Sequence, residues 1–197
     1  MLYFLVTTCL FNDCPTRMYE TWAGIMKLKK LTKDMNCKII IIENNGKRPT
    51  MLDKLGEVFY TNNNSLSFGK GVKELKDIFD CMRHYDIKDD DFIVKMTGRY
   101  LLDDKCPFIT SLKYMLGDTD CIIRFGPYYA PVMKKMNDCI TGLFGMRCKY
   151  VKEVKGTDGC IEWEWGRVAS RIPDERVFAL DKLGILINPG GEGYYAV

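Results

Sequence analysis

The sequence predicts an α/β protein with a mostly parallel sheet and helices on both faces, and two observations predict it. Short apolar runs typical of strands alternate, over the first hundred residues, with longer segments whose apolar residues recur at helical spacing. The first two of these runs are apolar at nearly every position, as strands buried on both faces of a parallel sheet are. Such an order joins parallel strands through right-handed crossovers, and ligands of such sheets bind at the carboxyl ends of the strands.

The expected elements follow in chain order. Strands of the first half are expected at 2–8, 37–43, 57–60 and 91–96. Helices are expected between them, with apolar residues at 18, 22, 25, 28 and 31 and at 72, 75, 78 and 82, and a short helix after Pro49. The second half predicts a helix at 107–116, a strand at 121–125, a helix at 161–172 closed by Pro173, and strands at 176–180 and 184–188.

Composition excludes several classes of protein. The chain has 197 residues and a net charge of +3, which is too small for a dedicated nucleic-acid binder. Its longest apolar runs, 2–6 and 39–42, are far shorter than a membrane span, and its first residues are typical of a buried strand rather than of a signal peptide. We therefore expect one cytoplasmic domain over 1–197, without a linker or repeat. The nine cysteines, which form no C-x-x-C pair, are expected to be free thiols.

The motifs of several common chemistries are absent. His84 is the only histidine, so Ser-His-Asp and Cys-His catalysis and multi-histidine zinc sites are disfavoured. We expect His84 itself to be a surface residue near the end of a helix. Gly69-Lys70-Gly71 matches only a fragment of a P-loop or a dinucleotide-binding loop.

The strand-end rule selects one group of candidate binding residues, because the expected strands end at polar loops. The rule nominates the ranges 7–12, 43–46, 61–69 and 95–100, and the candidates within them are Thr7, Thr8, Asn12, Glu43, Asn44, Gly69, Lys95, Thr97, Gly98 and Arg99. Lys70 is added to them because it opens the next helix after Gly69. The alternative is ordinary turn chemistry, since Asn, Asp and Gly end strands in many proteins.

Four strands with their loops read LVTTCLFN, IIIIENNG, FYTNNNSLSFGKG and DDDFIVKMTGRY. In this order they resemble the nucleotide-sugar half of a GT-A-fold (Rossmann-like) glycosyltransferase and, more narrowly, glycosyltransferases encoded by chloroviruses, the large DNA viruses of algae. The resemblance implies transfer of a sugar from a nucleoside-diphosphate sugar, with a UDP-sugar favoured, to a hydroxyl of a glycan or glycoprotein. Residues 1–102 would bind the donor and 103–197 the acceptor, and a viral protein would act in the host cytoplasm.

The resemblance also implies roles for the strand-end residues. Thr7, Thr8 and Asn12 would contact the nucleobase, and Glu43 and Asn44 the base or ribose. The helix that opens at Gly69 and Lys70 would present backbone amides to phosphate or to sugar hydroxyls.

The metal motif of the family is missing. GT-A enzymes end the central strand in Asp-x-Asp, which binds Mn²⁺ or Mg²⁺, whereas this chain has Lys95-Met96-Thr97. Asp103 and Asp104 follow the strand and are the metal candidates, although they also suit the start of the next helix. The run 89–91 precedes the strand and is expected to be a solvated turn. Without a metal, Lys95 and Arg99 would neutralise the diphosphate, with Thr97 and Gly98 allowing close approach of the backbone.

The segment 161–167, Ile-Glu-Trp-Glu-Trp-Gly-Arg, resembles the stretch of inverting GT-A enzymes that carries the general base. Glu162 falls at the base position and Glu164 is the second candidate; on a regular helix the two point about 160° apart, so they do not share one site. Trp163 would stack on a sugar. The alternative is an amphipathic helix with a solvated acidic side.

Other aromatic and basic residues are weaker candidates. Tyr128, Tyr129 and Trp165 would extend an acceptor platform with Trp163, or else pack in the core. Arg124 and Arg147 are further candidates for phosphate contact. The rival function is a catalytically inactive module of the same fold that binds a nucleotide sugar or serves as a structural surface, which the missing Asp-x-Asp motif favours.

Overall fold

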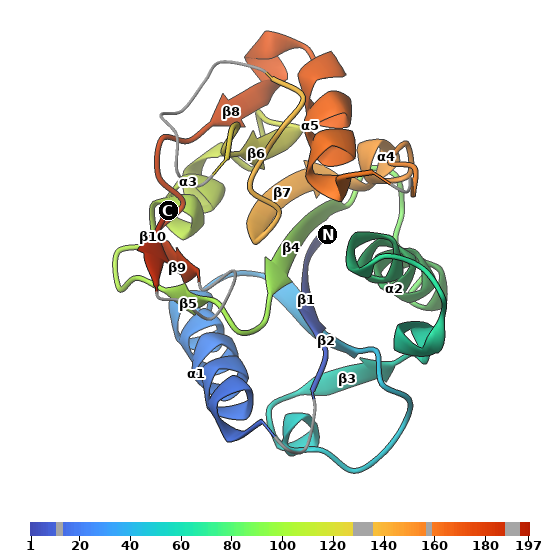
Figure 1. The fold of residues 1–197 in the computed structure, drawn as a ribbon. Helices are drawn as coiled ribbons and strands as arrows, with labels where there is room; N and C mark the ends of the chain where they lie inside the picture. Colours follow the sequence, from blue (N-terminus) through green and yellow to red (C-terminus); the bar gives the residue numbers. More distant parts are fainter. Residues whose placement is uncertain (11–13, 128–135, 157–158, 188–193) are drawn as a thin grey trace.

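The computed structural model describes the whole chain except residues 11–13, 128–135, 157–158 and 188–193. A seven-stranded sheet in the order β3-β2-β1-β4-β7-β6-β8 forms its centre (Figure 1). The strands are β1 Leu2–Thr8, β2 Cys37–Glu43, β3 Glu57–Tyr60, β4 Phe92–Thr97, β6 Cys121–Ile123, β7 Leu143–Arg147 and β8 Val177–Ala179.

The direction of the strands confirms the predicted fold class. β1 pairs in parallel with β2 and β4, β2 with β3, and β6 with β8. β7 runs antiparallel to both of its neighbours, β4 and β6. The parallel strands place their carboxyl ends at one edge of the sheet, which is where the strand-end rule expects a ligand.

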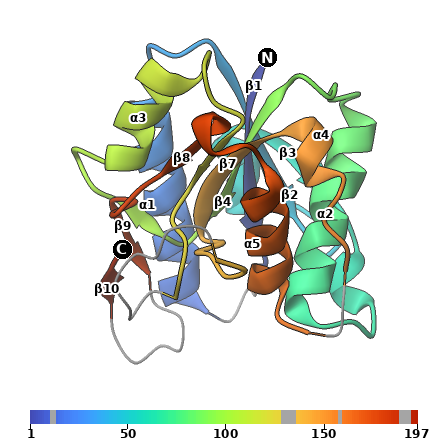
Figure 2. The same ribbon diagram turned by 90° about the horizontal axis from the view of Figure 1, so that it is seen from above.

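Helices cover both faces of this sheet, as predicted. They are α1 Pro15–Leu31, α2 Lys70–His84, α3 Pro107–Met115, α4 Cys148–Val151 and α5 Ile161–Arg171, with 3-10 turns η1 Met51–Lys54, η2 Asn63–Ser65 and η3 Asp174–Arg176. In Figure 2, α1 and α3 lie on one face, and α2, α4 and α5 lie on the other.

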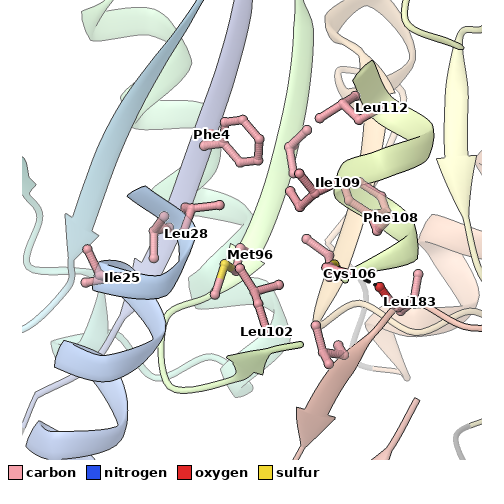
Figure 3. Packing of buried hydrophobic residues seen from close by; sticks show 14 of the residues in the cluster. Phe4, Ile25, Leu28, Met96, Leu102, Cys106, Phe108, Ile109, Leu112 and Leu183 are labelled. Atoms are coloured by element: carbon pink, nitrogen blue, oxygen red, sulfur yellow. Dashed lines mark hydrogen bonds between the residues drawn. The ribbon is translucent and has the colours of Figure 1, made fainter. Parts of the chain in front are cut away.

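Two clusters of buried side chains hold the layers together. Figure 3 shows the first, in which Ile25 and Leu28 of α1 and Phe108 and Leu112 of α3 pack against the sheet near Phe4. The second cluster lies under α2, α4 and α5. Successive residues of a strand face opposite sides, so 92, 94 and 96 of β4 join the first cluster and 93 joins the second. The same alternation places Lys95 on the face covered by α2 and α5.

A second, three-stranded antiparallel sheet is formed by β5 Leu101–Leu102, β9 Ile185–Ile187 and β10 Tyr195–Ala196. The sequence predicts the strand at β9 but not its partners. It also misses β7, because Gly145 interrupts the apolar run. The structure explains that glycine: a Cβ at this position would lie 2.5 Å from Cε1 of Phe92 on the neighbouring strand.

Smaller expectations were corrected. The short helix after Pro49 is the 3-10 turn η1, capped by Thr50. Asp103 and Asp104 do not start the next helix, because α3 begins at Pro107 and has no acidic residue in its first turn. His84, by contrast, is exposed at the end of α2, as the sequence predicts, and its ring packs 4.9 Å from that of Phe59. Across the described residues, every helix is too short or too polar to cross a membrane.

Candidate functional site

A cavity of about 720 Å³ lies at the carboxyl ends of β1 and β4, bounded by the first turns of α2 and α5. Many of the residues that the sequence predicts for the site line this cavity. They are Thr7, Thr8, Asn44, Gly69, Lys70, Lys95, Thr97, Arg99 and Glu162. Side chains separated by up to 155 positions in the chain are therefore brought to one place by the parallel sheet.

Other predicted residues lie elsewhere. Glu43, Gly98, Asp103, Asp104, Trp163 and Glu164 do not line the cavity. Asn12, Tyr128 and Tyr129 fall outside the described residues. Arg124 donates to the backbone oxygens of Asp181 and Pro127, and Arg147 to those of Asp90 and Leu116, so neither arginine belongs to the cavity.

Glu43 is fully buried and supports the loop after β1. Its carboxylate accepts hydrogen bonds from the Thr8 hydroxyl at 2.7 Å and from the Leu10 amide at 3.1 Å. It also pairs with Arg48 at 3.2 Å. The carboxylate therefore holds the loop after β1 in place without lining the cavity itself. Gly98 has a similar supporting role, because a Cβ there would lie 2.8 Å from the Thr8 side chain.

Lys95 is a buried basic side chain of the cavity, with 2% of its surface exposed. Its ammonium donates to the Thr97 hydroxyl at 2.9 Å and to the Thr141 carbonyl oxygen at 2.6 Å. It also pairs with Glu74 of α2 at 2.9 Å. An ammonium has three N–H donors, so all three are occupied. We call Thr7, Glu74, Lys95, Thr97 and Thr141 the Lys95 cluster.

A second polar group lies beside it, around Asp77 of α2. The Asp77 carboxylate accepts hydrogen bonds from Asn44 at 3.0 Å, from the Thr61 hydroxyl at 2.5 Å and from Asn63 at 2.7 Å. Burial raises the pKa of Asp77, and the three hydrogen bonds only partly offset this. Oδ1 of Asn44 is buried and lacks a hydrogen-bond partner within the described chain.

The N-terminus of α2 faces the cavity. Helix α2 begins at Lys70 after Gly69, without a side-chain cap or an acidic residue in its first turn. A Cβ on Gly69 would meet nothing within 4 Å, so this turn is open. Gly71 is different, because a Cβ there would lie 2.4 Å from Ile161, where α2 packs on α5. The unsatisfied amides of such a turn favour an anion.

Helix α5 brings Glu162 into the cavity and turns Glu164 away from it. Glu162 accepts hydrogen bonds from the Thr141 hydroxyl at 3.3 Å and from the Cys160 thiol at 2.9 Å. Glu164 instead pairs with Arg167 at 2.8 Å, and this hydrogen bond lowers the pKa of Glu164. Of the two glutamates only Glu162 lines the cavity, which agrees with the separation that helical periodicity predicts.

The two tryptophans of α5 divide in the same way. Trp165 is buried and packs against the ring of Phe144, with ring centroids 4.6 Å apart, so the core alternative describes it. Trp163 is 59% exposed and lies outside the cavity lining.

The carboxylates near the site do not suit a divalent metal. Asp104 is 79% exposed and paired with Lys27, which lowers the pKa of Asp104. Glu74 and Asp77 already accept hydrogen bonds or ion pairs from the protein. Among the described residues, no three His, Cys, Asp or Glu side chains are grouped so that they could hold a metal ion.

Sequence reasoning missed several residues of the cavity: Arg17, Lys73, Glu74, Asp77, Thr141 and Cys160. A signal for two of them was present, because Lys70, Glu74 and Asp77 recur at helical spacing on one face of α2. Counted over its described lining, the cavity carries five basic side chains against three acidic ones, so it favours an anionic ligand.

The fold and the cavity together define an α/β protein with an anion-favouring site at the carboxyl ends of its parallel strands. Its fold is similar to that of a solved structure described as a glycosyltransferase "involved in the glycosylation of the major capsid of PBCV-1". The likeness has a TM-score of 0.51 at 6% sequence identity and covers 92% of this chain and 82% of that one, so it concerns the fold alone. No protein-family model and no curated protein matches the chain.

Proposed function

We propose that this chain is a GT-A-type glycosyltransferase that moves a sugar from a nucleoside-diphosphate sugar, UDP-sugars being favoured, to a hydroxyl of a glycan. The observation that carries the proposal is one cavity that combines a surplus of basic side chains with a carboxylate, Glu162, at its edge. The basic side chains can bind a diphosphate, and the Glu162 carboxylate can accept the proton of an acceptor hydroxyl.

The diphosphate is assigned to the mouth of the cavity. Lys70 and Arg99 line the cavity together with the open first turn of α2. The two cationic side chains and the backbone amides of this turn can each bind a phosphate oxygen. Thr7, Thr8 and Asn44, at the ends of β1 and β2, are assigned to the nucleoside. Because the carboxylates do not suit a resident metal, the proposed mechanism stabilises the leaving diphosphate with these cations and amides.

Glu162 is assigned as the general base of an inverting reaction. It is the α5 carboxylate that lines the cavity, and Glu164 is already paired with Arg167. In the proposed step the acceptor hydroxyl gives its proton to Glu162 and attacks the anomeric carbon, whose bond to the diphosphate breaks. Trp163, exposed beside Glu162, is assigned to the acceptor sugar.

The setting is part of the same proposal. The structural neighbour is described as involved in the glycosylation of the major capsid of PBCV-1. For this chain we propose a viral origin, a cytoplasmic location and a glycan or glycoprotein acceptor. A second candidate, a nucleotide-sugar-binding module without catalysis, is favoured by the absence of a metal-binding carboxylate group from the described residues.

Titration calorimetry with UDP, GDP, CDP and UDP-sugars, each with and without Mn²⁺, tests the proposal. We expect UDP to bind without Mn²⁺, and Arg99→Ala and Lys70→Ala each to weaken binding about tenfold, because each removes a charge-assisted hydrogen bond. Lys33→Ala, an exposed lysine outside the cavity lining, is the matched control and should bind as the unaltered chain does. If no nucleotide binds, the proposal is wrong.

Turnover separates the two candidate functions. Incubation with UDP-sugars and glycan acceptors should release UDP, and Glu162→Gln should keep nucleotide binding while losing most of this release, because the amide takes up no proton. Nucleotide binding without UDP release from any donor and acceptor pair would favour the binding module.

A further inference from the structure

The Lys95 cluster contains a buried ion pair whose two members differ in mobility. Lys95 lies on the central strand β4 and is 2% exposed. Glu74 reaches it from helix α2 through a flexible side chain and is 27% exposed. Both residues line the cavity, so a ligand that enters meets this pair.

Two of the three acceptors of Lys95 are fixed. The Thr141 acceptor is a backbone carbonyl oxygen, 2.6 Å from Nζ, which cannot leave without moving the chain. The Thr97 hydroxyl, at 2.9 Å, lies two residues along the same strand. Glu74 is the third acceptor; its side chain is 27% exposed and can rotate away without moving the backbone, so it is the exchangeable one.

The Thr7 hydroxyl tolerates the loss of Glu74. It donates to Oε1 of Glu74 at 2.6 Å, and the carbonyl oxygen of Met96 lies 3.3 Å away as a second acceptor. If Glu74 swings out, Thr7 therefore keeps a hydrogen-bond partner. Lys95 does not, because a buried ammonium without an anionic partner is costly. Glu74 can leave only when another anion takes its place.

We propose that the Lys95 ammonium is an oxyanion subsite, which the Glu74 carboxylate occupies in the ligand-free chain and which a phosphate oxygen of the ligand takes over. The inference deepens the proposed function and rests on it for the identity of the natural ligand. Glu74 is a counter-charge that keeps the buried ammonium paired while the cavity is empty. It also makes the subsite selective, since a neutral group does not displace a carboxylate from Lys95.

Inorganic pyrophosphate, titrated calorimetrically in the absence of divalent metal, is the probe. Glu74→Gln should bind pyrophosphate roughly tenfold more tightly than the unaltered chain, because the competing carboxylate is gone. Glu74→Asp keeps the charge but is one methylene shorter, and should give a smaller gain. Glu162→Gln is the matched control: it removes one charge from the same cavity without touching Lys95, and should gain less than threefold.

A Lys95→Met background tests whether the gain acts through Lys95. In the Lys95→Met background, Glu74→Gln should increase the affinity for pyrophosphate no more than Glu162→Gln does. The inference is overturned if Glu74→Gln increases the affinity for pyrophosphate equally with and without Lys95. It is also overturned if Glu74→Gln binds pyrophosphate no more tightly than the unaltered chain. If Glu74→Gln fails to fold, as thermal unfolding would show, the Glu74→Asp result decides in the same way.

The outcomes separate this inference from the proposed function. Pyrophosphate carries neither a nucleoside nor a sugar, so a failure of all nucleotides to bind would contradict the proposed function and leave the pyrophosphate result standing. Conversely, tight UDP binding with no effect of Glu74 would overturn the inference alone.

Discussion

Gly24 lies where helix α1 crosses the turn that follows β4. A Cβ at this position would lie 2.4 Å from the carbonyl oxygen of Gly98 and 2.7 Å from that of Tyr100. Both are backbone atoms, which cannot move aside as a flexible side chain does. The glycine therefore allows α1 to approach the turn that carries Arg99 into the cavity.

Gly24→Ala is expected to lower the free energy of unfolding by about 1–3 kcal/mol, because overpacking must push α1 away from this turn. Urea unfolding followed by circular dichroism measures it. Gly117→Ala is the matched control, since a Cβ there meets nothing within 4 Å, and it should change stability by less than about 0.5 kcal/mol. Equal stability of the two variants would contradict the close approach.

At the scale of residues, the sequence identified which residues lie near the site better than it identified what each of them does. It selected Glu43 and Gly98 because polar residues and glycines end strands, but the structure uses both to support the β1 loop. Glu74 escaped notice because it lies inside a helix and follows no strand. Its importance comes from Lys95, 21 positions away in the chain, and helical periodicity alone does not show that pairing.

At the scale of elements, Asp120 joins the strands of the second half. It precedes β6 and pairs with Arg176 at 2.8 Å, Arg147 at 3.4 Å and Lys149 at 3.7 Å. Burial opposes ionisation of Asp120, but the hydrogen bond from Arg176 and the charges of its three partners outweigh burial and lower its pKa. Its ionised form therefore stabilises the connection between β6, β7 and η3.

The stabilisation should depend on pH in a defined direction. A carboxyl whose pKa is lower in the folded than in the unfolded chain stabilises the fold above its ordinary value of 3.8, and this contribution is lost as the pH falls below that value. Asp120→Asn should cost about 1–2 kcal/mol at neutral pH, and the difference should shrink at pH 3 or below. Urea unfolding at several pH values measures it; a difference independent of pH would contradict the ion-pair account.

Elements with a strong pattern were predicted with nearly their observed bounds. β1, β2 and β3 match the expected ranges, and α1, α2 and α5 begin or end within a few residues of theirs. β5 and β10 have two residues each, too few for any periodicity. β9 shows a pattern, but it belongs with β5 and β10 to the second sheet, and its pairing with β5, 83 and 85 positions away in the chain, leaves no local trace.

At the scale of the whole molecule, the fold is held without covalent cross-links. All nine cysteines are free, and five of them are buried in the core as small apolar side chains. Burial raises the pKa of Cys81 to about 12, so this thiol is a poor nucleophile at neutral pH. Packing of the two clusters on either side of the sheet supplies the stability.

The midpoint of thermal unfolding should therefore be the same with and without excess dithiothreitol. Because no disulfide is present to break, the reductant has no bond in the native chain to act on. Differential scanning calorimetry of freshly purified protein tests this. A midpoint that falls by several degrees in reductant would show that a disulfide contributes.

The sequence by itself determined the α/β class, the helices on both faces and the edge of the sheet at which the cavity lies. These follow from local periodicity and from the geometry of parallel strands, which any such pattern shares. Only the tertiary structure decided that β7 runs antiparallel to its neighbours and that Glu162 enters the cavity while Glu43 supports a loop. It also decided that the Glu74 carboxylate pairs with the Lys95 ammonium. Those outcomes depend on contacts between distant segments, and such contacts exist only once the chain has folded.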